Sequence, residues 1–215
     1  TKFTLKDIEE QFGSEIANII EGETKLDRLR YRGVERYAEN LRKMFFAMAS
    51  DVRVIFVKFA DRIHNLSTLD GIPEHKQKRI ALESLEIYAP IANRLGMGAI
   101  RRELEDRSFK YVFPKEYEWV SGLMKERYAV LEPYLETLKS AIMDDLRAAN
   151  IHVLDIHART KGLYSLYKKL TSHERDISKI YDIVACRIVV PDVGDCYNAL
   201  GVIHARWKPL KGRIK

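Results

Sequence analysis

The stretch VRVIFVKFADRIHNLSTL, residues 52–69, decides the fold of the first part of this chain. At the period of an α-helix its apolar side chains fall on one stripe, which consists of Val52, Ile55, Phe56, Phe59, Ile63 and Leu66. Polar side chains recur three or four residues apart on another face, at Lys58, Asp61, Asn65 and Thr68. A helix is the only regular structure that gathers these four groups on one side. We therefore expect an amphipathic helix with its apolar stripe in a core.

Asp61 is the candidate metal ligand of this helix. It lies close to Phe59 and Ile63, and a carboxylate in half-buried surroundings needs a cation or hydrogen bonds to stay charged. His64, one turn later, is a candidate second ligand. The alternative is an ordinary core helix in which Asp61 and Arg62 point to solvent and His64 is a structural hydrogen-bonding group. The helical pattern alone leaves both interpretations open.

Length and composition place the chain among globular proteins. A chain of 215 residues with 46% hydrophobic content can bury a core in one large domain or two small ones. It has no run of about 18 apolar residues and no N-terminal signal pattern, so we expect a soluble cytoplasmic protein. Its two cysteines, Cys186 and Cys196, indicate neither a disulfide framework nor a CxxC metal site, which fits a reducing compartment.

The positive charge is concentrated near the end of the chain. Residues 151–215 contain twelve Lys and Arg against six Asp and Glu, which accounts for the whole formal net charge of +6. A basic segment of this kind suits polyanions, so nucleotide phosphates, RNA and acidic lipids remain open as partners.

Helical periodicity predicts further helices at residues 5–12, 15–21, 35–49, 80–95, 99–111 and 116–150. A capping box of Thr4 and Asp7 opens the first helix, and Gly22 closes the second. Pro90 predicts a kink or a break in the helix at residues 80–95. Pro133 can be tolerated if it lies in a first turn. The first 150 residues are therefore expected to be helical.

The period changes at residue 151. Residues 151–159 alternate like a strand, and residues 182–190 are rich in β-branched side chains. Helical patterns at residues 163–170 and 195–206 follow the two strands in turn. We expect a mainly α protein whose last part is the beginning of an α+β domain.

The segment RTKGLYSLYKKL, residues 159–170, is the candidate phosphate site. Arg159 and Lys161 stand at the end of a strand, and Ser165 and Lys169 stand one turn apart on the next helix. The four donors can converge near the start of that helix, which favours anions through its N–H groups and dipole. Gly162 alone does not make a Walker loop. A solvated basic face is the alternative, and the pattern does not decide between them.

Three segments together resemble the Rel/SpoT family, whose bifunctional enzymes make and destroy the alarmone (p)ppGpp. They are TKL at residues 24–26, ADRIHN at residues 60–65 and EIYAPIANRLGM at residues 86–97. In that family the Asp of this helix completes a manganese site. The other ligands, a His and a His-Asp pair, precede the TKL segment, so we expect them to lie upstream of this chain.

The resemblance implies roles for three residues of the first helix. Asp61 would be a Mn²⁺ ligand in (p)ppGpp 3′-pyrophosphohydrolysis, Asn65 would serve the same activity, and Thr68 would contact the guanine nucleotide. Ser67 departs from the family, which usually has Arg at that place.

The pattern R-x-K-x-x-x-S-x-x-x-K, followed by an Asp that opens a strand, resembles the start of the family's synthetase domain. The resemblance implies that the ATP phosphates are held by Arg159, Lys161, Ser165 and Lys169. Asp182 would bind Mg²⁺ and Arg187 would add charge to the nucleotide pocket. Thr160 stands where the family commonly has Pro. The implied reaction transfers a pyrophosphoryl group from ATP to the 3′-OH of GTP or GDP.

We expect residues 1–75 to be the end of an HD-type hydrolase domain, residues 76–115 a helical linker bundle and residues 116–215 the start of the synthetase. Arg213 and Lys215 match the basic R-x-K-D motif of bifunctional members. The family's catalytic Glu and its guanine-stacking Tyr lie beyond Lys215, so this chain by itself is expected to be inactive.

One alternative is a non-catalytic module that binds a guanine nucleotide or associates with the ribosome. A basic RNA-binding domain ranks lower, because the chain lacks an RNP-like or interleaved aromatic pattern. The ribosome and tRNA are candidate partners through regions outside this chain. The sequence does not determine the oligomeric state.

Overall fold

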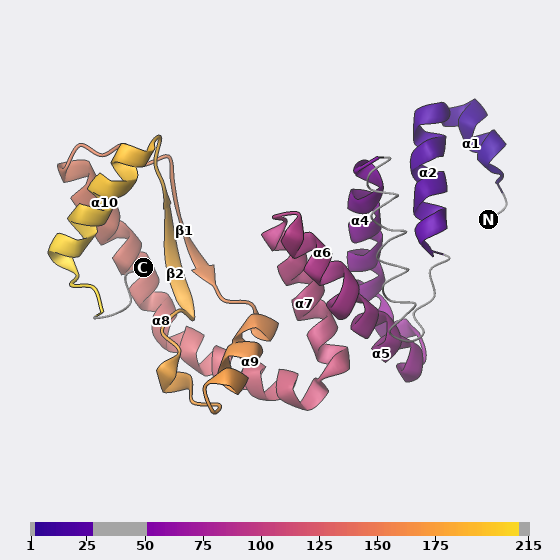
Figure 1. Ribbon diagram of the computed structural model, residues 1–215. Helices are drawn as coiled ribbons and strands as arrows, with labels where there is room; N and C mark the ends of the chain where they lie inside the picture. Colours follow the sequence, from indigo (N-terminus) through magenta and orange to yellow (C-terminus); the bar gives the residue numbers. More distant parts are fainter. Residues whose placement is uncertain (1–2, 28–50, 211–215) are drawn as a thin grey trace. The chain divides into compact units, whose positions relative to one another are not determined.

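The computed structural model describes residues 3–27 and 51–210. It contains two compact units, Thr1–Pro114 and Lys115–Lys215, which are described separately (Figure 1). The helix expected at residues 35–49 lies outside the described residues. The proposed division of the first unit into a hydrolase part and a linker bundle stays a prediction.

The first unit begins with two helices joined at Gly13. α1 (Leu5–Phe12) opens with the expected capping box, in which Thr4 Oγ1 accepts from Asp7 N and Thr4 N donates to Asp7 Oδ2. α2 (Ser14–Asp27) runs through Gly22, so the prediction that Gly22 closes this helix is wrong. A Cβ at this position would lie 2.9 Å from Val54 Cγ2. Gly22 therefore allows a close approach to Val54 and does not end the helix.

α4 (Arg53–Ser67) is the expected amphipathic helix, although its buried face is rotated from the predicted one. The expected apolar residues that are buried are Ile55, Phe59 and Leu66. Val52 and Phe56 are 48% and 45% exposed, and Lys58, expected on the polar face, is fully buried. Periodicity identifies the stripe, but the packing of neighbouring helices decides where its centre lies.

The chain then turns through η1 (Leu69–Gly71) into α5 (Glu74–Glu83). A π-helical turn, η2 (Ser84–Tyr88), leads directly into α6 (Ala89–Arg94), with Pro90 near its start. Proline has no N–H to donate and crowds the preceding turn, and a wider π turn accommodates both effects. Near Pro90 the chain therefore changes helix type, because the π-helical turn η2 runs directly into the α-helix α6.

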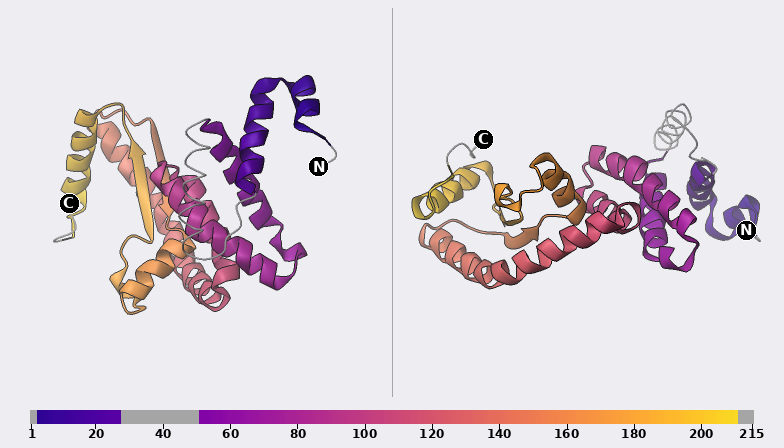
Figure 2. Two further views of the ribbon diagram at one scale, coloured as in Figure 1. Left: turned by 45° about the vertical axis from the view of Figure 1, so that its right-hand side comes forward. Right: turned by 90° about the horizontal axis from the view of Figure 1, so that it is seen from below.

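α7 (Gly98–Val112) completes the first unit. It packs against α4, α5 and α6, as Figure 2 shows, and it buries Leu104 and Phe109 completely. Because one helix contacts three others, the core of this unit is centred on α7. The end of α4, which carries the candidate hydrolase residues, is held by this core.

The second unit starts with the long helix α8 (Pro114–Ala148). Pro114 is its first residue, a position that tolerates proline because the first N–H has no intrahelical partner. The predicted helix over residues 116–150 is confirmed, but Pro133 lies inside it and not in a first turn, the position in which the sequence analysis expected a proline to be tolerated. A proline inside a helix removes one backbone hydrogen bond, and the many remaining bonds of this 35-residue helix accommodate it.

The remaining elements are β1 (Asp155–Thr160), α9 (Leu163–Ser172), η3 (Ile177–Lys179), β2 (Val184–Val189) and α10 (Val193–Arg206). Both strands begin later than predicted. Asn150 has a φ of 55°, which turns the chain after α8, and Ile151 is buried in the core before β1 begins. The hydrophobic alternation that starts at residue 151 therefore arises from side chains that pack in the core, although residues 151–154 connect α8 to β1 and are not part of the strand.

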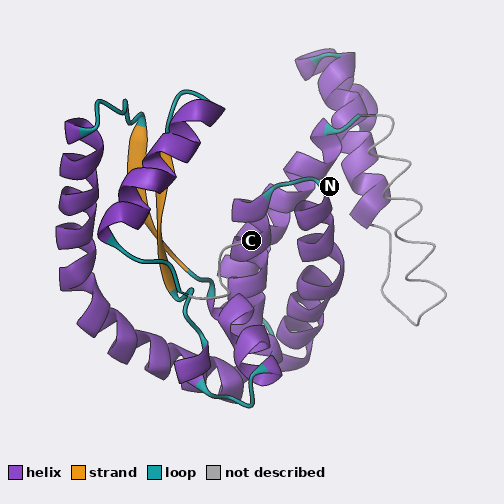
Figure 3. Ribbon diagram, turned by 60° about the vertical axis from the view of Figure 1, so that its left-hand side comes forward, coloured by secondary structure: helices purple, strands orange, loops and turns teal. Residues whose placement is uncertain are grey.

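β1 and β2 pair antiparallel, with Ile156 opposite Ile188 and His157 opposite Arg187. One face of this sheet packs against α8 and α10 through a core of Ile142, Leu146, Ile151 and Ala199 (Figure 3). Side chains alternate between the two faces of a strand. His157 and Arg187 therefore lie on the opposite face, where both are exposed.

The observed fold class agrees with the prediction. Helices make up the first unit, and the second contains a two-stranded sheet with helices. None of the helices in the described part of the chain is long and apolar enough to span a membrane.

Candidate functional site

Asp61 is the centre of the candidate site in the first unit. Its Oδ2 accepts a hydrogen bond from Asn65 Nδ2 at 3.0 Å and lies 3.6 Å from Lys58 Nζ. The Asp61 side chain is 40% exposed, so it is neither buried in the core nor fully solvated. Both neighbours therefore approach the Oδ2 side of the carboxylate.

Lys58 links this carboxylate to a second one. Its Nζ donates to Glu23 Oε1 on α2 at 2.9 Å, and the Lys58 side chain is completely buried. A buried ammonium needs charged or polar partners, because removal from water is costly. The sequence analysis placed Lys58 on the polar face but missed Glu23, since no local spacing relates two residues on different helices.

We expect Glu23→Leu to lower the free energy of unfolding of this chain by about 3 kcal/mol, because it removes one partner of a buried ion pair. The remaining contact with Asp61 keeps the loss at the lower end of the usual range. Urea unfolding followed by circular dichroism measures this change. The matched control is Lys6→Met, which breaks a fully exposed pair on α1 and should alter stability by less than about 0.5 kcal/mol. Equal stability of the two variants would contradict the buried-pair interpretation.

Arg62 is not a solvent-facing side chain, so that part of the alternative interpretation of the helix is wrong. Its Nη1 and Nη2 donate to Glu83 Oε2 and Oε1 at 3.1 and 3.0 Å, and its guanidinium lies 4.5 Å from the centre of the Tyr88 ring. Burial raises the pKa of Tyr88 above its ordinary value. These contacts connect α4 to the EIYAPIANRLGM segment, which contains Tyr88.

The other candidates of α4 lie near its end. Thr68 is exposed, and its Oγ1 donates to the carbonyl of Asn65 at 3.3 Å. His64 is also exposed. Asp61, Asn65 and Thr68 are spaced by four and three residues and therefore share one helix face. The structure brings Asn65 into contact with Asp61 but assigns no ligand role to His64.

A carboxylate oxygen is a suitable donor for Mn²⁺, so Asp61 fits the ligand role that the resemblance implies. Within residues 3–27 and 51–210, however, no group of three or more His, Cys, Asp or Glu is placed to hold a metal ion. If Asp61 is a ligand of such a site, further ligands from outside the described part of the chain would be needed to complete it.

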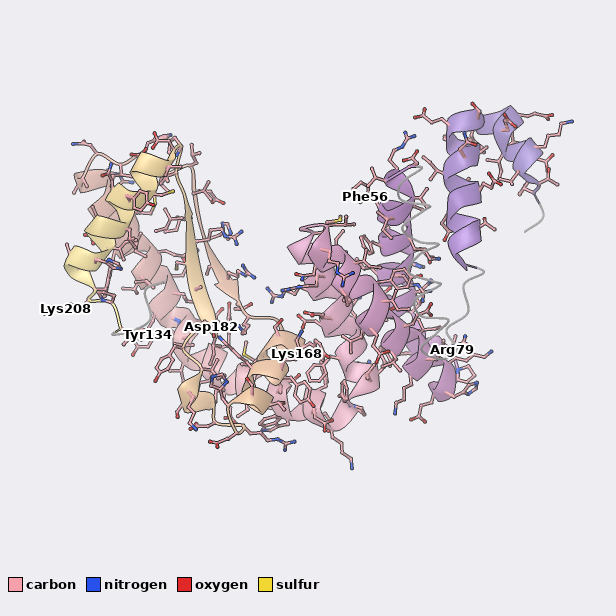
Figure 4. The ribbon with its side chains drawn as sticks, in the orientation of Figure 1. Phe56, Arg79, Tyr134, Lys168, Asp182 and Lys208 are labelled. Atoms are coloured by element: carbon pink, nitrogen blue, oxygen red, sulfur yellow. The ribbon has the colours of Figure 1, made fainter. Side chains whose placement is uncertain are left out.

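The candidate site of the second unit is built around Asp182, which Figure 4 labels. Lys161 Nζ donates to Asp182 Oδ2 at 2.8 Å, and Lys169 Nζ lies 2.6 Å from both carboxylate oxygens. Lys161 follows β1, Lys169 is in α9 and Asp182 precedes β2. The sequence predicted these three residues for one site, and the structure brings them into contact.

This ion-pair cluster keeps Asp182 charged. Partial burial acts to raise the pKa of the carboxyl, but hydrogen bonds from Lys161 and Lys169 outweigh it and lower the pKa from 3.8 to about 2. A depressed pKa stabilises the folded state above pH 3.8, and this contribution is lost as the pH falls through about 2. Near neutral pH the Asp182 carboxylate is therefore ionised.

Two predicted arginines lie on the exposed face of the sheet. Arg159 is opposite Ala185, and Arg187 is two pairs further along, opposite His157. Ser165 is partly buried in the first turn of α9, whose N-cap Gly162 makes no side-chain capping bond. The candidate set therefore extends from the exposed face of the sheet to α9, where Ser165 is in the first turn and Lys169 in the last, and of these residues the lysines contact Asp182.

The electrostatics of this site favour an anion. Four cationic side chains belong to this site: Lys161 and Lys169 contact the carboxylate of Asp182, and Arg159 and Arg187 lie on the exposed face of the neighbouring sheet. The start of α9 adds the positive end of a helix dipole. A phosphate group can accept from the lysines in place of Asp182, which would then be available to a divalent cation.

Two family models match this chain, and each covers one of the two candidate sites. A family model described as "HD domain" matches residues 1–98, which include Asp61. A second, described as "Region found in RelA / SpoT proteins", matches residues 158–215, which include the cluster around Asp182.

Several curated relatives match the chain over its whole length. A Synechocystis sp. protein named probable guanosine-3′,5′-bis(diphosphate) 3′-pyrophosphohydrolase is 45% identical over 216 residues, which cover 100% of this chain and 28% of that protein. A Myxococcus xanthus protein named GTP pyrophosphokinase is 45% identical over 219 residues, covering 100% and 29%. An Aquifex aeolicus protein named guanosine-3′,5′-bis(diphosphate) 3′-pyrophosphohydrolase is 40% identical over 216 residues, covering 100% and 31%.

The chain thus spans less than a third of the length of each of these relatives. Both the HD domain and the RelA/SpoT region are represented in it, in the same order as the two units of the structure. This chain therefore belongs to the RelA/SpoT family.

Proposed function

We propose that the chain is a segment of a longer enzyme of (p)ppGpp metabolism. Its second unit would take part in ATP-dependent pyrophosphoryl transfer to GTP or GDP, and its first unit in manganese-dependent 3′-pyrophosphohydrolysis of (p)ppGpp. The contact of Lys161 and Lys169 with Asp182 carries this proposal, because it assembles phosphate donors and a metal-binding carboxylate within the matched RelA/SpoT region. Similarity to relatives named for both activities supports it.

In the synthetase reaction this chain mainly binds and neutralises ATP. Lys161, Lys169, Arg159 and Ser165 would donate to its phosphate oxygens, and Arg187 would add positive charge to the nucleotide pocket. Asp182 would exchange its two lysine partners for Mg²⁺, which supplies charge neutralisation and orientation of the phosphates when it is bound. Such positioning lowers the barrier because charge that develops on the transferred group meets donors already in place.

In the hydrolase reaction Asp61 would hold Mn²⁺, which supplies an activated water when it is bound. Asn65 would keep the Asp61 carboxylate oriented through its hydrogen bond to Oδ2, and Lys58 would hold the same oxygen from the buried side. Thr68, exposed on the same helix face, would contact the guanine nucleotide. The metal site would be completed by a His and a His-Asp pair upstream of residue 24.

The direct test compares the full-length protein with the 215-residue chain. We expect the full-length protein to form ppGpp from ATP and GDP with Mg²⁺, and to release pyrophosphate from ppGpp with Mn²⁺. Both products can be measured by anion-exchange chromatography. A full-length protein that binds these nucleotides but performs neither reaction would refute the proposed function.

We expect the 215-residue chain alone to perform neither reaction. Asp61 provides too few ligands for useful manganese affinity, since transition-metal sites need several converging N and O groups. The resemblance assigns the base that would activate the 3′-OH to a Glu of the longer enzyme outside these 215 residues. Weak ATP binding that decreases with added salt should remain, because exposed phosphate contacts are screened. Formation of ppGpp, or release of pyrophosphate, by the isolated chain would contradict this assignment of the missing groups.

A further inference from the structure

A histidine outside the R-x-K-x-x-x-S-x-x-x-K motif lies beside the two arginines of the candidate nucleotide site. The register places His157 opposite Arg187, and Arg159 follows two residues later on the same face of β1. All three side chains are exposed on the face turned away from the core of the second unit. We call His157, Arg159 and Arg187 the sheet-face group.

The ring of His157 has a defined orientation. Its Nδ1 lies 2.9 Å from Oδ2 of Asp155, which precedes it by two residues on the same face. An ionised carboxylate only accepts hydrogen bonds, so in the neutral ring Nδ1 carries the hydrogen and donates it. The opposite ring nitrogen, Nε2, is then an acceptor. His157 therefore differs from the cations around it, because it can receive a hydrogen bond from a ligand.

The sheet surface between the two arginines is open. Ala185 is the partner of Arg159 in the register and adds only a methyl group to this face, where it is exposed. A flat ring system can lie over such a residue without displacing a larger side chain. Arg187, which lies beside His157, can stack on it through its planar guanidinium group.

The position of the lysines orients a nucleotide along β1. Lys161 and Lys169 bind phosphate best, so the phosphates belong at their end of the sheet. A strand rises about 3.3 Å per residue, which places His157 roughly 13 Å from Lys161 along β1. A nucleotide whose phosphates contact the lysines can therefore extend its base toward the sheet-face group.

We propose that His157, held by Asp155, accepts a hydrogen bond from the exocyclic amine of adenine and makes this site select ATP. Adenine presents an N–H donor at its 6-position, whereas guanine and hypoxanthine present an oxygen acceptor there. An acceptor at Nε2 thus can receive a hydrogen bond from the 6-amino group of adenine, whereas it repels the 6-oxygen of guanine and hypoxanthine. This inference rests on the proposed synthetase function and names the residue that distinguishes the donor nucleotide.

The test measures kcat/KM of the full-length enzyme for ATP and for ITP as the pyrophosphoryl donor, with GDP as the acceptor. His157→Leu should reduce the ATP-to-ITP ratio about three- to tenfold, which corresponds to the loss of one hydrogen bond. His157→Gln should retain most of the ratio, because its side-chain carbonyl can accept in place of Nε2. The matched control, His152→Leu, changes an exposed histidine that precedes β1 and should leave the ratio unchanged.

Two outcomes overturn the inference. One is a wild-type enzyme with no preference for ATP over ITP, and the other is a folded His157→Leu variant with an unchanged ratio. If His157→Leu does not fold by circular dichroism, His157→Phe provides the same comparison. Lys161→Ala separates this inference from the function on which it rests. Full synthesis by that variant would refute the phosphate site itself, whereas loss of its synthesis beside an unchanged ratio in His157→Leu would refute only the role of His157.

Discussion

Replacement of Lys169 by Ala in the full-length enzyme should lower the rate of (p)ppGpp synthesis by about a hundredfold or more. The Lys169 ammonium contacts both oxygens of Asp182 and stands beside Lys161, where phosphate oxygens would develop charge during transfer. Loss of one preorganised donor to such a charge typically costs about 100- to 1000-fold in kcat. Asp182→Asn should have a comparable effect, because it weakens the carboxylate that would hold Mg²⁺. Initial rates of ppGpp formation from ATP and GDP measure both variants.

The matched control for this experiment is Lys168→Ala. Lys168 is the neighbouring residue of α9 and is exposed, but its Nζ lies over the ring of Tyr164, at 4.6 Å, and is not part of the cluster around Asp182. Its replacement removes the same charge from the same helix and should change synthesis by less than a few-fold. If Lys169→Ala and Lys168→Ala show the same small decrease, the basic residues form a solvated surface and do not bind the ATP phosphates.

Replacement of Asp61 by Ala should abolish (p)ppGpp hydrolysis by the full-length enzyme while synthesis stays within about twofold of wild type. Under the proposed function, removal of the carboxylate would delete a Mn²⁺ ligand, and a deficient metal site would not activate water. Asn65→Ala should reduce hydrolysis less severely, because Asn65 orients Asp61 and does not replace it. Release of pyrophosphate from ppGpp at a fixed Mn²⁺ concentration measures hydrolysis, and manganese binding by electron paramagnetic resonance gives a second readout.

Asp70→Ala provides the control for loss of an acidic residue in the same unit. Asp70 is exposed and pairs with Lys110 and Tyr111, away from the α4 face that carries Asp61. We expect Asp70→Ala to keep both activities. Hydrolysis at the wild-type rate by Asp61→Ala, with unchanged manganese binding, would show that Asp61 is not a ligand. Because Lys58 keeps its contact with Glu23 in that variant, its fold should remain intact.

Local patterns predicted those parts of the structure that depend on neighbouring residues. The capping box of Thr4 and Asp7 needs only three residues of spacing, and the fold places its atoms as expected. The contact of Asn65 with Asp61 follows from their separation by one turn of α4. The helix–strand order of the second unit was also predicted, since it follows from a change of hydrophobic period.

Predictions failed where packing between distant segments competed with local preference. Gly22 resembles a helix stop, but it lies inside α2 because Val54 of another helix requires a residue without a Cβ. Pro133 resembles a helix start, but it lies within α8. In each case the conformational preference of the single residue contributes little free energy, and the free energy gained by burying a whole helix face outweighs it.

The sequence by itself determined which residues are candidates for the chemistry. Spacing and residue type single out Asp61, Asn65 and the R-x-K-x-x-x-S-x-x-x-K pattern, and the resemblance to the Rel/SpoT family implies their roles. Only the tertiary structure decided their partners. It paired Lys58 with Glu23, placed Arg62 between Glu83 and Tyr88, and set His157 beside Arg187. These contacts join residues 21 to 35 positions apart, and no helical or strand period links such distances along a chain. They form because buried charges require partners and because strand register fixes which side chains share a face.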